Sequence, residues 1–345
     1  MMNCVALLRR CLVATLLALT PAAHAADAAP RLKVSTGPKA CIFDLMGSQG
    51  ENYALARDIL LQAQREGVQM QLVPYMNEAV AYEDFKAGQC DAVMITNLRA
   101  RQFNRFVGSV DAIGAVPNEQ TLRAVLSLLL SPKSAERMVS GPFEVAGIVP
   151  LGAVYPFVDD RNINTLAKAA GKKIAVFDWD RTQRKLVQNI GAMPVSSDIL
   201  NFATKFNNGQ VDIIAAPGIA FRPLELHRGL GTKGAIVNMP FMQITAVMVI
   251  RHEKFKPGDG QKLRSVVASR LDNSFALIKR SEADIPSQYW SRVPQVEIDD
   301  YFRLMREARV AMTQDGEYDP DMMRFLKRVR CRYEPANAEC ILDDE

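Results

Sequence analysis

The residues best suited to chemistry in this sequence lie in the loop Asp178–Arg181, where Trp179 stands between the carboxylates of Asp178 and Asp180. An aromatic plane between two carboxylates favours a cationic or polyol ligand, and a cation over the ring adds about 0.5–2 kcal/mol. The loop ends on Arg181. A structural role fits the same residues, with Asp178 capping the next helix and Trp179 packed into the core.

Further polar residues follow other short apolar runs. Asp44 ends one run, and Gly47 and Gly50 after it would let backbone N–H groups approach an anion at a helix N-terminus. Ser48 either contributes to that site or only caps the helix. In open α/β sheets, ligands bind beyond the carboxyl ends of the strands. We therefore expect one ligand site formed by Asp44, Ser48, Thr96, Asn97, Arg99, Asp178, Trp179, Asp180, Arg181 and Pro217.

Two motifs occur twice in the same order, which indicates an internal duplication. Lys39–Asp44 and Lys173–Asp178 share Lys-x-x-(Ile/Val)-Phe-Asp, and both have the apolar character of buried parallel strands. Phe85–Val93 and Phe206–Ile214 share Phe-x-x-Gly-Gln-x-Asp followed by two apolar residues. Each of these predicts a helix end, a Gly C-cap and then a strand.

Helical stretches between the paired motifs make each half a strand–helix alternation, which predicts two doubly wound α/β lobes. The apolar segments 122–130 with 145–157, and then 235–250, would cross between the lobes and act as a hinge. The predicted organisation is a signal peptide at 1–25, lobe 1 at 26–145, lobe 2 with hinge strands at 146–250, and a C-terminal helical segment at 251–345. Cationic residues such as Arg330 in this last segment are expected on a solvated helix face.

The first 25 residues have the pattern of a cleavable secretory signal, with Arg9 and Arg10 before an apolar run and small residues up to Ala25. No later apolar run reaches the ~18 residues that a membrane span needs. An even number of cysteines remains in an oxidising compartment, and Cys331 and Cys340 are the pair that we expect to be bridged. Cys41 and Cys90 are either a second disulfide or two buried free thiols.

Composition and motifs favour neither an enzyme nor a nucleic-acid binder. Lys plus Arg is 42 against 38 for Asp plus Glu, so the net charge of +4 is too small to indicate a nucleic-acid surface. His227 and His252 have no metal-ligand spacing, and no nucleophile elbow or phosphate-loop lysine motif occurs. We expect no metal, no cofactor and no catalytic residues.

With these motifs in place, residues 31–310 resemble the periplasmic solute-binding proteins of TRAP transporters, the DctP type. The likeness is clearest at Leu166–Val176, Gly191–Val195 and Asn208–Asp212. The family pattern has an arginine, which holds a ligand carboxylate, where this sequence has Ala175. Arg181 or Arg99 would have to replace it, or the cleft takes a neutral or cationic ligand.

The start Lys39–Asp44 also resembles the AdeT-like subgroup, whose members carry an efflux label tied to aminoglycoside resistance. The resemblance implies a periplasmic receptor that captures a small polar ligand between two lobes and delivers it to inner-membrane transporter subunits. An accessory protein of an efflux system is the alternative.

Overall fold

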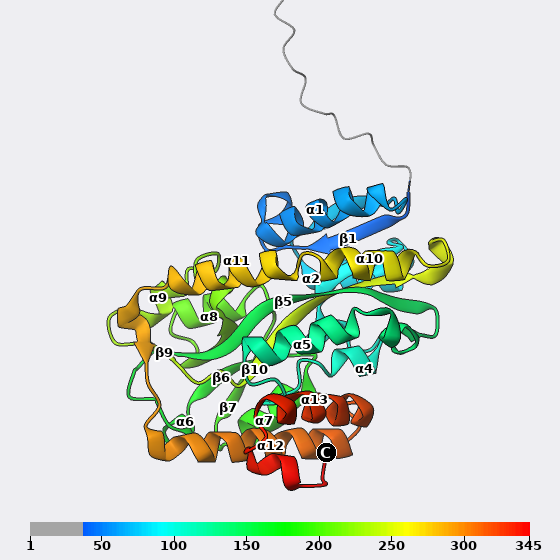
Figure 1. Cartoon of the computed structure of the whole chain (residues 1–345). Helices are drawn as coiled ribbons and strands as arrows, with labels where there is room; N and C mark the ends of the chain where they lie inside the picture. Colours follow the sequence, from blue (N-terminus) through cyan, green and yellow to red (C-terminus); the bar gives the residue numbers. More distant parts are fainter. Residues whose placement is uncertain (1–36) are drawn as a thin grey trace, which may run out of the picture. The chain divides into compact units, whose positions relative to one another are not determined.

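The computed structural model describes residues 37–345, so the predicted signal peptide lies outside the described residues (Figure 1). These residues form a mixed α/β structure, as the sequence predicts. The strands are β1 (Lys39–Phe43), β2 (Gln71–Tyr75), β3 (Ala92–Thr96), β4 (Val139–Ser140), β5 (Phe143–Val158), β6 (Lys173–Phe177), β7 (Met193–Ser197), β8 (Ile213–Pro217), β9 (Ala235–Val237), β10 (Met242–Arg251) and β11 (Trp290–Ser291). The helices are α1 (Glu51–Arg65), α2 (Glu78–Lys86), α3 (Asn97–Ala100), α4 (Arg105–Gly108), α5 (Glu119–Leu129), α6 (Leu166–Ala169), α7 (Arg181–Asn189), α8 (Phe202–Asn207), α9 (His227–Leu230), α10 (Asp259–Ala268), α11 (Leu271–Ala283), α12 (Ile298–Gln314) and α13 (Pro320–Tyr333).

The strands form one sheet with two parallel groups on either side of two long antiparallel strands. The order is β2-β1-β3-β10-β5-β8-β6-β7. β1 pairs in parallel with β2 and β3, and β6 pairs in parallel with β7 and β8. Between these groups, β10 runs antiparallel to β3 and β5, and β5 runs antiparallel to β8. The two long strands therefore connect the two parallel groups, as expected for crossing segments.

The repeated motifs occupy equivalent places in the two parallel groups. Asp91 Oδ2 accepts a hydrogen bond of 2.8 Å from the N–H of Lys39, the first residue of β1. Asp212 Oδ2 accepts one of 2.7 Å from the N–H of Lys173, the first residue of β6. The helix before each acid is followed by a glycine with positive φ, Gly88 and Gly209, at 76° and 67°. This shared geometry agrees with the duplication inferred from the sequence.

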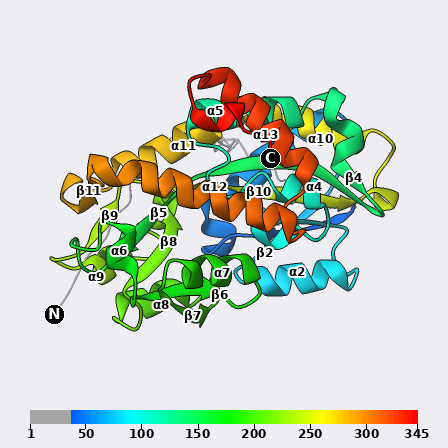
Figure 2. The ribbon, with the colours of Figure 1, turned by 90° about the horizontal axis from the view of Figure 1, so that it is seen from below.

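Helices cover both faces of the long strands. α10 and α11 run along β5, and α12 crosses on the other side of β5 and β10 (Figures 1 and 2). The expectation that 122–130 belongs to a crossing strand is wrong, because this segment lies in helix α5. Asn118 caps α5 by accepting the Thr121 N–H, and apolar residues at helical spacing are buried beneath it. The expected strand 235–250 is divided into β9 and β10, with Pro240 between them.

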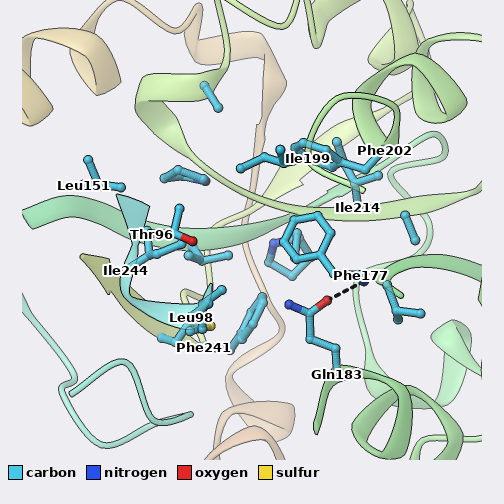
Figure 3. A pocket seen from close by; sticks show the side chains of 18 of the residues that line it. Thr96, Leu98, Leu151, Phe177, Gln183, Ile199, Phe202, Ile214, Phe241 and Ile244 are labelled. Carbon is cyan, nitrogen blue, oxygen red and sulfur yellow. Dashed lines mark hydrogen bonds between the residues drawn. The ribbon is translucent and has the colours of Figure 1, made fainter. Parts of the chain in front are cut away.

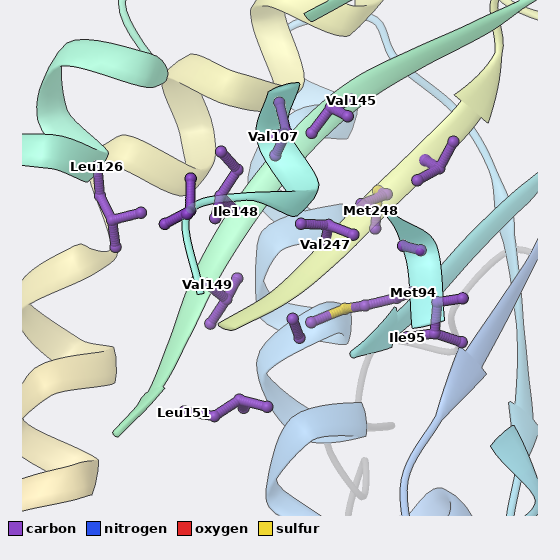
Figure 4. Packing of buried hydrophobic residues seen from close by; sticks show 14 of the residues in the cluster. Met94, Ile95, Val107, Leu126, Val145, Ile148, Val149, Leu151, Val247 and Met248 are labelled. Carbon is purple, nitrogen blue, oxygen red and sulfur yellow. The ribbon is translucent and has the colours of Figure 1, made fainter. Parts of the chain in front are cut away.

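The main hydrophobic core lies around β5 and β10. Figure 4 shows side chains of β3, β5 and β10 packing together, with Val107 of α4 and Leu126 of α5 against them. Ile148 on β5 and Val247 on β10 are almost wholly buried. Because both strands are covered on both faces, their sequences are continuously apolar rather than alternating. The main hydrophobic core thus lies where the two parallel groups meet.

Both disulfides form, which settles the open question about Cys41 and Cys90. The Cys41–Cys90 bridge joins β1 to the turn before β3, and the Cys331–Cys340 bridge closes the tail as expected. The two bridges span 49 and 9 residues along the chain. By chain-entropy reasoning the longer loop contributes about 4 kcal/mol and the shorter about 2.5 kcal/mol to the free energy of unfolding.

The C-terminal segment is held by buried ion pairs, so the expectation of a solvated face is wrong for Arg330. Its guanidinium contacts Glu339 at 3.0 Å and Glu345 at 2.8 Å, and Arg309 contacts the same two carboxylates. Arg309 and Arg330 also donate to the carbonyl oxygens of Ile113 and Ala115 at 2.9 Å each. These bonds fix the turn at 113–115, and pairing with carboxylates is what permits burial of the two cations.

A buried carboxylate joins β10 to the segment after β3. Asp111 accepts hydrogen bonds from the N–H and hydroxyl of Thr245, at 3.0 and 2.7 Å, and from the Asn97 amide at 3.3 Å. Burial raises the pKa of Asp111 to about 6, although these hydrogen bonds act in the opposite direction. The folded protein therefore binds the Asp111 proton more tightly than the unfolded chain does.

This difference predicts a pH dependence of stability. The Asp111 contribution is fully present below the unfolded pKa of 3.8 and is lost as the pH rises towards 6, a change of about 3 kcal/mol in the free energy of unfolding. Denaturant titrations at a series of pH values should show this fall in the wild type and its absence in Asp111→Asn. The exposed control Asp58→Asn should keep the wild-type slope. An unchanged slope in Asp111→Asn would contradict the assignment.

Candidate functional site

A cavity of 540 Å³ opens at the carboxyl ends of strands from both parallel groups. Phe43 and Thr96 reach it from the ends of β1 and β3, and Phe177 and Pro217 from the ends of β6 and β8. The long strands β5 and β10 also contribute, for example Leu151 and Ile244, which point into the space shown in Figure 3. This is the position that the strand-end rule predicts, and the volume is within the usual range of about 300–1,000 Å³ for small-molecule sites.

The structure brings part of the predicted site together. Asp44, Thr96, Asp180 and Pro217 line the cavity. The remaining predicted ligand residues lie outside its lining, namely Ser48, Asn97, Arg99, Asp178, Trp179 and Arg181.

Asp44 organises the loop at the mouth of the cavity. Its two carboxylate oxygens accept the backbone N–H groups of Met46 and Tyr53, at 2.8 and 3.1 Å. Gly50, the N-cap of α1, has no space for a side chain, because an added Cβ would lie 1.7 Å from Asp44 Oδ1. Ser48 is exposed in the 3₁₀ turn before this position and is not the cap. The Asp44 carboxylate is therefore already used to hold its own loop.

Thr96 and Arg99 share one buried partner. Glu78 accepts from the N–H and hydroxyl of Thr96 at 2.7 and 2.6 Å, and from Arg99 Nε at 3.1 Å. Burial raises the pKa of Glu78, and the hydrogen bonds and the Arg99 charge oppose that rise. Asn97 is wholly buried and donates to the Val107 carbonyl at 2.9 Å. These contacts fix the end of β3, and Asn97, whose Oδ1 has no hydrogen-bond partner within residues 37–345, lies outside the cavity lining together with Arg99.

Arg99 also contacts the loop after β6. Its guanidinium lies 4.4 Å from the centre of the Trp179 ring, and Trp179 stacks on Phe177 at 5.5 Å. The cation expected near Trp179 is thus the protein's own Arg99. Because α3 follows β3 and the β6–α7 loop follows β6, the contact bridges the two parallel groups. Asp178 and Arg181 of the same loop are exposed.

Asp180, not Asp178, caps α7. Its Oδ1 accepts the N–H groups of Thr182 and Gln183 at 2.9 and 3.2 Å. Gln183 in turn accepts the Phe177 N–H at 3.0 Å, which holds its side chain over the cavity in Figure 3. Thr182 lines the cavity at 6% exposure, and its hydroxyl has no hydrogen-bond partner within residues 37–345. The first turn of α7 therefore presents several polar groups to the cavity.

Arg101 and Tyr318 complete a polar cluster that the sequence reasoning missed; we use this name for Arg101, Asp180, Thr182, Gln183 and Tyr318. Arg101 lines the cavity, donates from Nε to the Gly108 carbonyl at 3.2 Å, and lies 5.1 Å from the Tyr318 ring. Burial raises the pKa of Tyr318 to about 12, so its hydroxyl stays protonated. The sequence shows that Arg101 lies two residues after Arg99. It does not show which of the two side chains faces the cavity.

Other types of site find little support in the described part of the chain. Among residues 37–345, no group of three His, Cys, Asp or Glu side chains is placed to hold a metal ion. Over the same residues, no helix is both long enough and apolar enough to span a bilayer.

The contact between Arg99 and Trp179 generates a testable prediction. In a double-mutant cycle with Arg99→Ala and Trp179→Ala, the coupling in the free energy of unfolding should be about 1 kcal/mol, the size of a partly buried cation–π pair. The cycle removes two separate contributions to the free energy of unfolding: the loss of the Glu78 ion pair in Arg99→Ala and the loss of Phe177 stacking in Trp179→Ala. Replacing the adjacent exposed residue, Arg181→Ala, should show no coupling with Trp179→Ala. Strictly additive losses for Arg99 and Trp179 would contradict the bridge.

Comparison with known proteins places the chain in a family. The profile described as "Solute-binding protein AdeT 1/2" matches residues 63–345. The chain is 51% identical over 304 residues to a probable solute-binding protein AdeT1 of Acinetobacter baumannii, covering 88% of this chain and 100% of that protein. It is 29% identical over 237 residues to a probable solute-binding protein AdeT2 of the same species, covering 68% and 98%.

Solved structures agree in fold. A TRAP periplasmic solute-binding protein from Desulfovibrio salexigens with bound orotic acid superposes with a TM-score of 0.72 at 13% identity, covering 86% of this chain and 99% of that one. One from a Bradyrhizobium species with bound galacturonate gives 0.68 at 14% identity, covering 85% and 99%. At these identities the match confirms the predicted fold. The chain thus has the fold of the TRAP periplasmic solute-binding proteins and belongs to the AdeT 1/2 family of solute-binding proteins.

Proposed function

We propose that this protein is a periplasmic receptor that captures a small organic ligand in the strand-end cavity and delivers it to inner-membrane transporter subunits. The observation that carries the proposal is the 540 Å³ cavity, which residues from both parallel groups line. Family membership supports the receptor role. The related folds with bound orotic acid and galacturonate support a small molecule as the cargo.

Ligand capture would work by closure around the cavity. The proposed lobes, at 26–145 and 146–250 with helices at 251–345, would move about β5 and β10, and contacts from both sides exist only when they approach. A ligand that touches both sides favours that closed arrangement by its differential affinity. The contact between Arg99 and Trp179 would further stabilise the closed arrangement. Of the predicted residues, Asp44, Thr96, Asp180 and Pro217 would frame the ligand, with Arg101 as the cation nearest to it.

Binding without catalysis is the role that the cavity chemistry supports best. Asp44 accepts backbone N–H groups with both carboxylate oxygens and Asp180 with Oδ1 alone, and these bonds hold their loops. A general base would need to be free to accept a proton from a substrate. Charged groups with uncommitted atoms are the exposed Glu51 carboxylate, Asp180 Oδ2 and the Arg101 guanidinium, and the chemistry of Arg101 is recognition of an anion. From this cation and from family membership we propose a receptor and not an enzyme.

Thermal unfolding against a panel of compounds tests the proposal. The panel contains carboxylates, sugar acids, amino acids, polyamines and aminoglycosides. A ligand at 100 times its dissociation constant should stabilise the fold by about 2.7 kcal/mol and raise the midpoint by several degrees. Arg101→Met should abolish the shift given by an acid, whereas the exposed control Arg181→Met should keep it. A panel without any shift would refute the receptor and favour the efflux accessory.

A further inference from the structure

Most of the cavity wall is apolar. Aromatic and aliphatic side chains from β5, β6, α8, β8 and β10 point into it in Figure 3, among them Phe177, Ile199, Phe202, Ile214 and Ile244. Phe177 and Phe202 meet edge to face at 5.7 Å and form one aromatic wall. Phe177, Ile199 and Ile244 are only partly buried, so they leave apolar surface facing the cavity. A wall of this kind is complementary to hydrocarbon and not to a layer of hydroxyl groups.

One position on this wall differs from the pattern of the TRAP receptors. Ala175 lines the cavity on β6, where the resemblance to the TRAP receptors implies an arginine. A methyl group there offers no hydrogen bond and adds to the apolar surface. A ligand body rich in hydroxyl groups would lose its bonds to water on this side and regain none.

The polar cluster has more free donors than free acceptors. Arg101 uses Nε for the Gly108 carbonyl, and its two Nη atoms form no hydrogen bond within residues 37–345. Gln183 accepts from Phe177, so its amide nitrogen is left to donate. The Tyr318 hydroxyl accepts the Ile113 N–H at 3.4 Å and keeps its own proton for donation. Thr182 adds an unpaired hydroxyl.

These donors require a partner that mainly accepts. A carboxylate accepts up to four hydrogen bonds and donates none, whereas an ammonium group only donates. Asp180 accepts both backbone N–H groups through Oδ1, which leaves Oδ2 as one free acceptor against the several free donors of the cluster. The cluster therefore matches an anionic head group.

From the apolar wall and the donor cluster together, we propose that the ligand is an amphipathic monoanion, with one carboxylate-like head at Arg101, Thr182, Gln183 and Tyr318 and a hydrocarbon body against Phe177, Ile199 and their neighbours. The inference rests on the receptor function proposed above and specifies the chemical class of its cargo. The cavity of 540 Å³ is within the usual range for small-molecule sites and leaves room for a body of several carbons beyond the head.

Calorimetric titration of the purified protein with butanoate, hexanoate and octanoate tests this class. Each added methylene group that enters the cavity should raise the affinity about fourfold, so octanoate should bind about 200-fold more tightly than butanoate. The heat capacity change should become more negative along the series. Octylamine has the same body with a cationic head, and it should bind at least tenfold more weakly than octanoate. Malonate and galacturonate should bind more weakly than octanoate.

A pair of neighbouring substitutions locates the hydrocarbon. Ile199→Asn places an amide on the cavity wall and should weaken octanoate binding by about tenfold, with a smaller effect on butanoate. Leu200→Asn is the matched control, because Leu200 is exposed and lies outside the cavity lining. Its octanoate affinity should equal that of the wild type. Thermal unfolding of both variants checks that each is folded before titration.

The outcomes separate this inference from the receptor function. Tight binding of malonate or galacturonate without any gain along the carboxylate series would overturn the amphipathic class and leave the receptor intact. Octanoate binding that is unaffected by Ile199→Asn would place the hydrocarbon elsewhere and would also overturn the inference. Absence of binding by every acid tested would overturn this inference, whereas the receptor is overturned only if the whole thermal panel, amines included, gives no shift.

Discussion

The antiparallel pairing of β5 with β10 is the constraint on which the rest of the structure depends. The register runs from Met242 opposite Val154 to Arg251 opposite Phe143, with irregularities after Ile244 and Met248. Each parallel group attaches to one of these strands, β3 to β10 and β8 to β5. The buried guanidinium of Arg264 fastens the far end of β5, because it donates to Glu144 and to the Val145 carbonyl at 2.7 and 2.8 Å. Separation of β5 from β10 would therefore part the strand ends of one parallel group from those of the other.

The loops at the cavity are fixed by carboxylates that serve the protein itself. Asp44 holds the loop before α1, Glu78 holds Thr96 and Arg99, Asp111 holds Thr245, and Asp180 holds the start of α7. Each acid accepts hydrogen bonds from donors that would otherwise be buried without a partner. Such pairing is the condition for burying polar groups. After these acids are paired, most of the free polar groups in the polar cluster are donors, and Glu51 adds an exposed carboxylate to the cavity lining. An apolar space with free donors on one side selects its ligand by both hydrocarbon fit and charge.

Much of the fold was readable because it follows from local patterns. The apolar runs ending in Asp44 and Asp178 gave the strands, the Gly-Gln-x-Asp motifs gave the helix ends, and the spacing of Cys331 and Cys340 gave one disulfide. The prediction for segment 122–130 is wrong because an apolar run of this length fits a strand or a buried helix, and the Asn118 cap decides between them.

The site was less readable because it depends on side-chain direction. The choice between Arg99 and Arg101, two residues apart, is made by Glu78 and Trp179, which lie far away in sequence. Likewise, α7 starts at Arg181, so its N-cap is the preceding residue, Asp180. Asp180 is therefore buried at the cavity, whereas Asp178 is exposed. Arg330 is buried by Glu339 and Glu345, a pairing that no helix-face pattern shows. Long-range partners of this kind are set by the tertiary fold and not by local spacing.

The most direct test of the account is to fill the cavity and measure binding. Ala215 on β8 lines the cavity with an exposed side chain, so Ala215→Trp would occupy the space without disturbing a buried contact. Titration calorimetry would use the carboxylate that gives the largest thermal shift with the wild type. The account predicts one-to-one binding by the wild type and loss of at least tenfold in affinity for the variant, with an unchanged unfolding midpoint without ligand. Equal affinity of a folded Ala215→Trp protein would contradict the claim that this cavity is the binding site.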